Sequence, residues 1–189
     1  MYIPAISVQQ GSVHLQRRKL LAQAFQPRVL ASYIASMMDV TRNYLDRWEQ
    51  QGTLTWYPEL RNYTLDIACQ LLVGVSSGSQ TAFGQWFETW AQGVFSVPLR
   101  LPGTKFSRAL RSRKLLLGEI ERIARSRQQH AGTGQDSLGI LMNAQDEQGN
   151  KLSLDELKDQ VSISFALEVS HKSVTSQLFL GSNSASSRV

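Results

Sequence analysis

The sequence predicts a mainly α fold with little or no sheet. Apolar residues recur at steps of three and four through most of the chain, whereas no run alternates apolar and polar residues at the period of a strand. The length of 189 residues and the apolar content of 42% suffice for one domain with a packed core. We therefore expect six or seven helices around a common core.

The first expected helix, from His14 to Phe25, contains the residues from which a function can be argued. Positions four apart share a helix face, so His14 and Arg18 point the same way. A hydrogen-bond donor next to a guanidinium suits a carboxylate or phosphate, because the guanidinium fork matches planar anions. The alternative is an ordinary solvated basic face. An apolar band lies beside the pair: Leu20, Leu21, Ala24 and Phe25.

The second and third helices are expected at Pro27–Gln51 and Pro58–Val75. Proline suits the first turn of a helix, and Gly52 ends the second helix. Two amphipathic helices joined by a short turn should pack antiparallel, each burying its apolar stripe on the other. The stripe of the second helix comprises Leu30, Tyr33, Ile34, Met37, Met38, Thr41, Tyr44, Leu45 and Trp48.

An aromatic helix follows the break at Gly74–Gly78. Its stripe contains five rings, those of Phe83, Trp86, Phe87, Trp90 and Phe95. Such stripes usually belong to a core, but aromatic side chains also form the walls of pockets for long apolar ligands. Both interpretations stay open on these residues alone.

A stiff connector and a long basic helix come next. Two prolines prevent a continuous helix, while Val97, Leu99 and Leu101 need cover from the core, a ligand or a membrane surface. Thr104 caps the following helix, whose apolar stripe includes Leu116 and whose other face is basic.

The net charge of +5 is concentrated between residues 100 and 127. An excess of this kind is compatible with nucleic acid, an anionic membrane surface or a solvated face. No aromatic residue interleaves the basic face, so we expect no nucleic-acid binding. A helical module that binds an acidic partner or nucleic acid is the alternative function.

Two further helix starts are marked near the end of the chain. Asp136 caps a short helix, and the capping box Ser153–Glu156 begins another. That last helix has one apolar side, formed by Leu154, Leu157, Val161 and Phe165.

Neither a metal site nor a disulfide is expected. Cys69 is the single cysteine, with no basic neighbour in sequence to activate its thiol, and the three histidines are widely spaced.

The opening residues lack a secretion signal, and no stretch of about 18 apolar residues occurs. We expect a cytoplasmic protein that touches membranes peripherally at most.

Several segments together resemble one family, the cytochrome P-450 haem-thiolate monooxygenases. The resemblance begins with the pattern Gly11–Pro27, continues in register and covers the chain up to about Val161. It implies a partial cytochrome P-450 fold, from helix C to the start of helix I. The segment Leu101–Thr104, followed by Phe106 and a basic helix, looks most like the branch that hydroxylates retinoic acid and its bacterial relatives. The later matching segments are Tyr57–Leu60, Leu65–Ala68, Pro102–Thr104 and Leu152–Gln160.

The resemblance implies a cofactor, a substrate class and partners. In the family, the positions that match His14 and Arg18 contact the haem propionates, and the aromatic helix helps to roof the substrate pocket. Phe87, Trp90 and Phe95 are therefore expected near a long apolar, retinoid-like substrate. An electron-donor redox protein is the expected partner.

The last part of the chain departs from the family pattern. In the family, a Glu-x-x-Arg pair and a glycine-flanked cysteine that binds the iron follow the last of these helices. This chain ends before either, which predicts a product inactive alone. Ser170, His171, Lys172 and Ser173 form a degenerate oxygen-activation segment, with lysine where the family has an acid, so no catalytic residue is assigned. We expect a lead-in at 1–12, a helical part at 13–169 and a divergent, disordered tail at 170–189. A change of coding frame or splicing near Val161 is our hypothesis for this ending.

Overall fold

A computed structural model describes residues 11–94, 96–130, 134–162, 164 and 165. The helices in chain order are α1 (Gly11–Ala22), the 3-10 turn η2 (Gln23–Phe25), α2 (Pro27–Gln51), α3 (Trp56–Val73), the 3-10 turn η3 (Gly78–Gln80), α4 (Ala82–Val94), α5 (Lys105–Gln129) and α6 (Ser137–Asn143). Residues 154–162 are also helical. The described residues contain no strand, only an isolated antiparallel bridge between Gln145 and Lys151. The mainly α prediction is confirmed.

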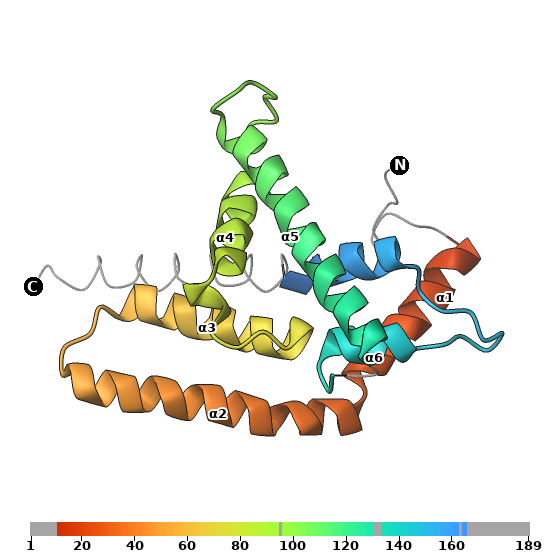
Figure 1. The fold of residues 1–189 in the computed structure, drawn as a ribbon, viewed down its shortest axis with the longest axis horizontal. Helices are drawn as coiled ribbons and strands as arrows, with labels where there is room; N and C mark the ends of the chain where they lie inside the picture. The colour runs from red at the N-terminus through yellow and green to blue at the C-terminus, as the bar shows by residue number, and fades with distance from the viewer. Residues whose placement is uncertain (1–10, 95, 131–133, 163, 166–189) are drawn as a thin grey trace, which may run out of the picture.

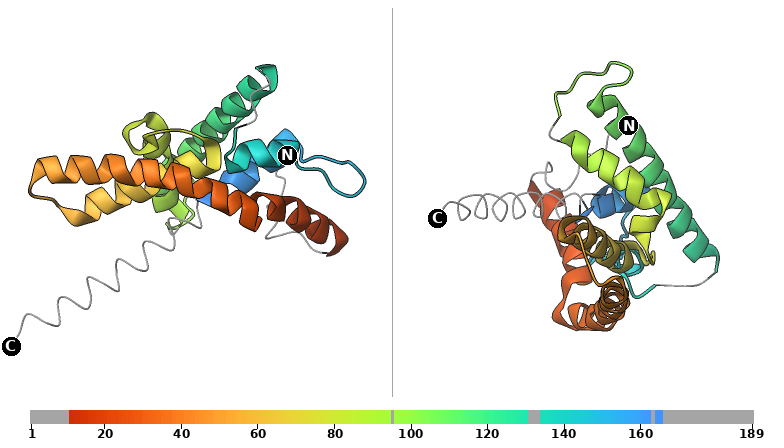
Figure 2. Two further views of the ribbon diagram at one scale, coloured as in Figure 1. Left: turned by 90° about the horizontal axis from the view of Figure 1, so that it is seen from below. Right: turned by 90° about the vertical axis from the view of Figure 1, so that its left-hand side faces the viewer.

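The helices form two antiparallel pairs joined by shorter elements. Figure 1 shows α2 and α3 side by side, with α4 and α5 rising from them, and Figure 2 shows the same arrangement from two other directions. Helix α6 contacts α3, α5 and η2, and α1 continues into η2. Gly93 of α4 faces Ala109 of α5 so closely that a methyl group at Gly93 would overlap the Ala109 side chain. A small residue therefore lets these two helices approach.

The core lies where α3, α4, α5, α6 and the helical residues 154–162, 164 and 165 meet. Leu116, Ile120 and Ala124 of the predicted α5 stripe are completely buried, as is Phe165. Burial of each large aliphatic side chain stabilises a fold by about 1.5–3 kcal/mol, so this cluster dominates the stability of the chain. Its other buried members are Ala24, Leu65, Ala68, Cys69, Val73, Phe83, Phe87, Leu138, Leu141, Leu157 and Val161.

Helix α2 buries less of its stripe than the sequence predicted. Tyr33 and Tyr44 are buried, but Ile34 and Leu45 are more than half exposed. At about 100° per residue, these two lie about 100° round the helix from the buried tyrosines, beyond the side that one neighbouring helix covers. The prediction that α2 and α3 pack antiparallel is confirmed, whereas the prediction that each buries its whole stripe on the other is wrong. The other exposed members of the stripe are Leu30, Met37 and Met38.

A buried carboxylate joins α2, α3 and η3. The Tyr44 hydroxyl donates to Oδ2 of Asp66 at 2.6 Å, and the backbone N–H of Ser79 donates to Oδ1 at 2.6 Å. Ser79 Oγ adds a third bond at 3.0 Å. Asp66 is 3% exposed, so its charge is balanced by these donors rather than by water. Burial, together with the Asp66 carboxylate, raises the pKa of Tyr44 above its usual value.

The predicted helix caps are formed. Thr104 Oγ1 accepts from Ser107 N at 3.2 Å, and the Asp136 carboxylate accepts from Gly139 N at 3.0 Å. The side chain of Glu156 accepts from both the backbone N–H and the hydroxyl of Ser153, as in a capping box. These caps fix the starts of α5, α6 and the helix at 154–162.

Candidate functional site

Helix α1 has three consecutive cations, which differ in their contacts. Arg17 forms an ion pair with Glu156, and Lys19 Nζ lies 2.7 Å from Glu147 Oε1, so both are tied to the segment that leads into the last helix. The hydrogen bond from Lys19 lowers the pKa of Glu147. Arg18 is exposed and forms no ion pair within the described residues. Its guanidinium is the one of the three that can receive an external anion.

The backbone of α1 places positions 14 and 18 one helical turn apart on the same face, as predicted. The helix begins at Gly11, inside the range expected to be an irregular lead-in, and the His14 side chain lies outside the described residues. Leu20 and Ala24 are buried and anchor the helix, while Phe25 is half exposed. The apolar band therefore holds α1 against the core through only part of its length.

The aromatic stripe of α4 separates into core and partly open rings. Phe83 and Phe87 pack tilted against Phe165, with ring centroids 5.5 and 5.2 Å apart. Trp90 meets Phe87 edge-on at 6.0 Å and keeps part of its surface accessible. Phe87 is 1% exposed and belongs to the core, so Trp86 and Trp90 are the described rings of the stripe that keep surface for a ligand. Phe95 and the segment 170–173 lie outside the described residues.

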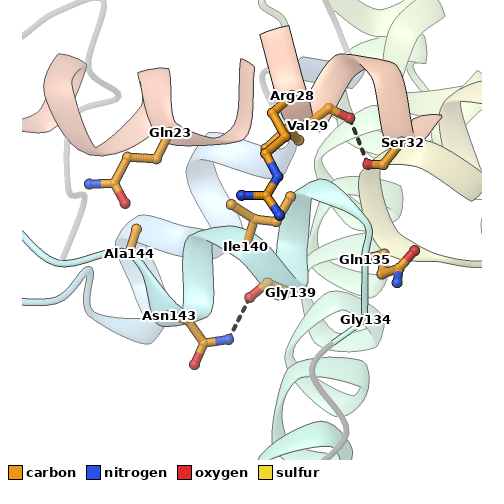
Figure 3. A pocket seen from close by; sticks show the side chains of 10 residues that line it. All are labelled: Gln23, Arg28, Val29, Ser32, Gly134, Gln135, Gly139, Ile140, Asn143 and Ala144. Atoms are coloured by element: carbon orange, nitrogen blue, oxygen red, sulfur yellow. Dashed lines mark hydrogen bonds between the residues drawn. The ribbon is translucent and has the colours of Figure 1, made fainter. Parts of the chain in front are cut away.

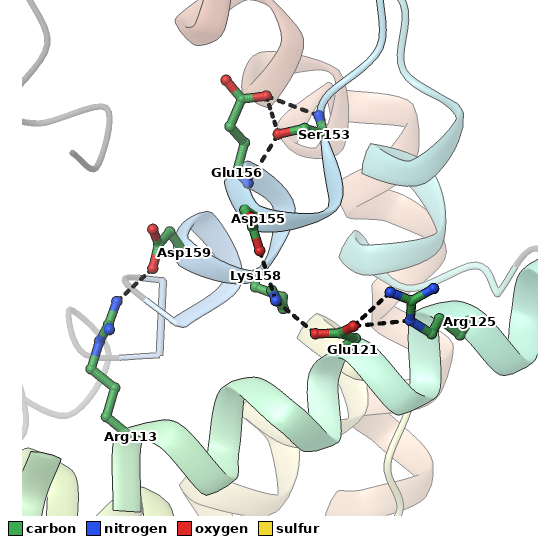
Figure 4. A network of polar contacts seen from close by, with 8 residues as sticks. All are labelled: Arg113, Glu121, Arg125, Ser153, Asp155, Glu156, Lys158 and Asp159. Carbon is green, nitrogen blue, oxygen red and sulfur yellow. Dashed lines mark hydrogen bonds and ion pairs between the residues drawn. The ribbon is translucent and has the colours of Figure 1, made fainter. Parts of the chain in front are cut away.

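A network of charges holds the last helix against α5 (Figure 4). Lys158 Nζ lies 2.7 Å from Glu121 Oε2 and 2.8 Å from Asp155 Oδ1. Arg113 donates to Asp159 Oδ1 at 2.5 Å. The hydrogen bond from Lys158, supported by Arg125, lowers the pKa of Glu121. Arg113 and Arg125 of the basic face are therefore paired. The sequence did not reveal the pairing of Glu121 with Lys158 or of Arg113 with Asp159, because these partners are 37 and 46 residues apart.

Arg127 forms a second connection that sequence reasoning missed. Its guanidinium donates to Asp136 Oδ1 and to the carbonyl oxygen of Val73, both at 2.7 Å. It thus joins the end of α3, the end of α5 and the start of α6. Gly74 lies so close to both charged side chains that a methyl group would displace them.

A pocket of about 530 Å³ opens between the start of α2 and α6 (Figure 3). None of the predicted site residues lines it. The hydroxyl of Ser32 and the amide of Asn143 donate to carbonyls of their own helices, so neither is directed at a ligand. The lining residues are Gln23, Arg28, Val29, Ser32, Gly134, Gln135, Gly139, Ile140, Asn143 and Ala144.

The described part of the chain also bears on metal binding and membrane crossing. No group of three or more histidine, cysteine, aspartate or glutamate side chains is placed to hold a metal ion there. No helix in that part combines the length and the apolar character that a membrane crossing requires.

Known relatives and solved structures define the class of protein. The chain belongs to the cytochrome P-450 family, whose cofactor is haem, and forms a partial fold of that family. It is 42% identical over 174 residues to cytochrome P-450 120 of Synechocystis sp., covering 92% of this chain and 39% of that relative. It is 30% identical over 155 residues to the beta-amyrin 28-monooxygenase of Medicago truncatula, covering 78% of this chain and 32% of that relative. The chain thus spans less than two fifths of the length of these relatives, and no family model matches it.

Solved structures agree with this assignment. The retinoic acid-bound cyanobacterial CYP120A1 superposes with a TM-score of 0.76 at 42% identity, over 87% of this chain and 38% of that one. The testosterone complex of CYP109E1 from Bacillus megaterium superposes with a TM-score of 0.70 at 16% identity, over 86% of this chain and 41% of that one. The second likeness shows the fold alone.

Proposed function

We propose that this chain supplies the part between helix C and the start of helix I of a haem-dependent monooxygenase that hydroxylates a long apolar substrate. The observation that carries the proposal is the 42% identity over 174 residues, or 92% of this chain, to a cytochrome P-450. The reaction depends on haem, which activates dioxygen when it is bound to the protein.

His14 and Arg18 are the residues that would hold the haem propionates. The exposed guanidinium of Arg18 has no carboxylate partner in the described structure, whereas Arg17 and Lys19 are engaged. An arginine in this state fits a carboxylate group from outside the chain, because it exchanges water for a charge-assisted, two-pronged hydrogen bond. The two engaged cations hold α1 to the segment 147–156 and so keep Arg18 in place.

The substrate would be a long apolar molecule with a carboxylate, of the retinoid kind. The support is the retinoic acid bound to the 42% identical structure, together with the partly open ring of Trp90. Within this proposal Trp90 and Phe95 contact the substrate, and Phe87 supports Trp90 from the core through its edge-on ring contact.

The proposal includes partners and a location. An electron-donor redox protein would deliver electrons in the cytoplasm, and the enzyme would touch a membrane peripherally. The described helices share one core, which supports a single helical unit at 13–169 followed by the divergent segment 170–189.

The experiment is a hybrid enzyme. Residues 13–165 of this chain replace the matching segment of the 42% identical cyanobacterial relative, and retinoic acid is titrated into the purified hybrid. Spectral binding of retinoic acid is expected, and it should weaken more than fivefold in Trp90→Ala. A hybrid that contains haem but does not bind retinoic acid would overturn the substrate proposal.

A further inference from the structure

Aromatic rings of α2 and α3 touch one another in a row that leads from the interior to the surface near the α2–α3 turn. The Trp48 ring lies between those of Tyr44 and Trp56, with its centroid 5.5 Å from each, and meets both edge-on. Tyr44 is 4% exposed, whereas Trp56 is 58% exposed. We call Tyr44, Trp48 and Trp56 the aromatic relay.

The inner end of the aromatic relay is hydrogen-bonded to a base. The Tyr44 hydroxyl donates to Oδ2 of Asp66 at 2.6 Å, a distance at which a proton can pass directly between two side chains. Asp66 is 3% exposed, so a proton that reaches it removes a buried charge rather than creating one. Tyr63 is different, because its hydroxyl lies 2.9 Å from the neutral hydroxyl of Thr41.

Arg47 favours the loss of a proton together with an electron at Tyr44. Its guanidinium carbon lies 4.0 Å from the centroid of the Tyr44 ring. A cation at this distance attracts the π electrons and opposes a second positive charge on the ring. Tyr44 keeps its proton at neutral pH, since burial and the hydrogen bond to Asp66 raise its pKa. Electron loss from this ring is therefore favoured when the hydroxyl proton moves to Asp66 at the same time.

The middle ring also has a carboxylate partner. Trp48 Nε1 donates to Oε2 of Glu59 at 2.7 Å. A negatively charged acceptor on the indole N–H stabilises positive charge on the ring. Trp48 can therefore carry a positive charge between its two neighbours.

We propose that the aromatic relay transmits a one-electron oxidation from the protein surface to Tyr44, which holds it as a neutral tyrosyl radical. A one-electron oxidant takes an electron from Trp56, Trp48 passes an electron to Trp56, and Tyr44 passes one to Trp48. The O–H bond of Tyr44 breaks, and its proton forms a bond with Oδ2 of Asp66. In balance, the oxidant gains one electron, Tyr44 loses one electron and one proton, and Asp66 gains the proton. No step uses haem, so the proposal is independent of the monooxygenase function.

The test places the oxidant at the turn between α2 and α3 of the whole chain. Cys69 is buried, so a thiol-reactive ruthenium bipyridine complex attaches at the exposed position 53 in Thr53→Cys. Light and an electron acceptor then produce ruthenium(III), the one-electron oxidant. Every protein also carries Tyr57→Phe, because the exposed Tyr57 ring would react with ruthenium(III) directly. We expect a tyrosyl radical in transient absorption and electron paramagnetic resonance, formed more slowly in deuterium oxide because a proton moves with the electron.

Variants assign the radical and its route. Tyr44→Phe should lose the tyrosyl signal and leave the oxidation on tryptophan, whereas the matched control Tyr63→Phe should keep it. Trp48→Phe should slow radical formation, since phenylalanine is too difficult to oxidise to act as a relay. Asp66→Asn retains an oxygen that accepts the Tyr44 hydrogen bond but cannot take the proton, so it should lose the tyrosyl signal. Circular dichroism checks that each variant keeps its helix content.

A second labelling site tests whether the route is local. The loop 145–151 lies at the opposite end of the molecule from the α2–α3 turn (Figures 1 and 2), and ruthenium attached through Gln148→Cys should oxidise Tyr44 much more slowly. Equal rates from the two sites, a tyrosyl signal that persists in Tyr44→Phe, or equal losses in Tyr44→Phe and Tyr63→Phe would overturn the proposal. If Asp66→Asn does not fold, equal rates in water and deuterium oxide for the parent chain would exclude the proton transfer.

Discussion

Among the tyrosines of α2 and α3, Tyr44 is expected to cost the most free energy of unfolding when its hydroxyl is removed. In Tyr44→Phe the Asp66 carboxylate loses a 2.6 Å donor in a site that is almost closed to water. A hydrogen bond to a charged group contributes about 1.5–3 kcal/mol, and Ser79 still donates to Asp66. We therefore expect a loss of about 2 kcal/mol in the free energy of unfolding, or a Tm lower by about 4–8 °C.

Tyr63→Phe is the matched control. The Tyr63 hydroxyl lies 2.9 Å from Thr41 Oγ1 in a partly buried, uncharged pair, which is worth about 0.5–1.5 kcal/mol. Urea unfolding of the whole chain, monitored by circular dichroism, gives the loss in free energy of unfolding for each variant. The dependence of this free energy on urea concentration should be unchanged. Equal losses in the two variants would refute the assigned role of Asp66.

The same site predicts a pH dependence. Because the pKa of Tyr44 is raised above 10.0 in the folded chain, the unfolded chain loses this proton first as the pH rises. The contribution of Tyr44 to the free energy of unfolding is therefore constant below about pH 10. It falls as the pH rises from the pKa of Tyr44 in the unfolded chain to its pKa in the folded chain. Tyr44→Phe should show a shallower alkaline loss, and the decline that remains includes Tyr33, whose pKa burial also raises.

Four further outcomes are expected. Gly93→Ala should cost about 1–3 kcal/mol in urea unfolding because its methyl group overlaps Ala109, whereas Gly118→Ala, on an open part of α5, should stabilise the chain by about 0.5–1 kcal/mol. Glu121→Gln should reduce the loss of stability below about pH 4.5, since the lowered pKa of Glu121 stabilises the fold above that pH and the contribution disappears as the carboxylate is protonated. In the hybrid enzyme, Trp90→Ala should lower retinoic acid affinity more than protein yield, and equal losses would make Trp90 a core residue. The 189-residue chain alone should give no thiolate-type band in a reduced carbon monoxide difference spectrum, because its one cysteine, Cys69, is completely buried.

Local signals in the sequence located most helix ends. The bounds Pro27–Gln51 agree with the prediction because proline begins the helix and Gly52, at φ 69°, ends it. Helix α3 starts at Trp56 rather than Pro58, since proline is tolerated anywhere in the first turn. The caps at Thr104 and Asp136 were likewise readable from residue type.

Tertiary pairing was not readable in the same way. Arg17 and Glu156 are separated by most of the chain, and nothing in either local pattern links them. Asp66 offered a weak signal, a carboxylate inside the apolar stretch of α3, but its partner Ser79 belongs to the short 3-10 turn η3. The aromatic stripe was open to two interpretations because periodicity gives the buried face of a helix and not what lies against it. The structure places Phe87 in the core, and its role toward a substrate stays a prediction.

The central proposal is that residues 13–165 form the propionate-binding part of a cytochrome P-450 fold, with Arg18 on a propionate. The direct measurement is the rate of haem loss from the hybrid enzyme to an apoprotein acceptor, with the reduced carbon monoxide spectrum as the check on the thiolate bond. We expect a thiolate-type band in the hybrid and a haem loss about tenfold faster in Arg18→Ala, but unchanged in Arg28→Ala, as a charge-assisted hydrogen bond of about 1.5 kcal/mol implies. A hybrid with native helix content and no thiolate band, or equal rates in the two variants, would contradict the account.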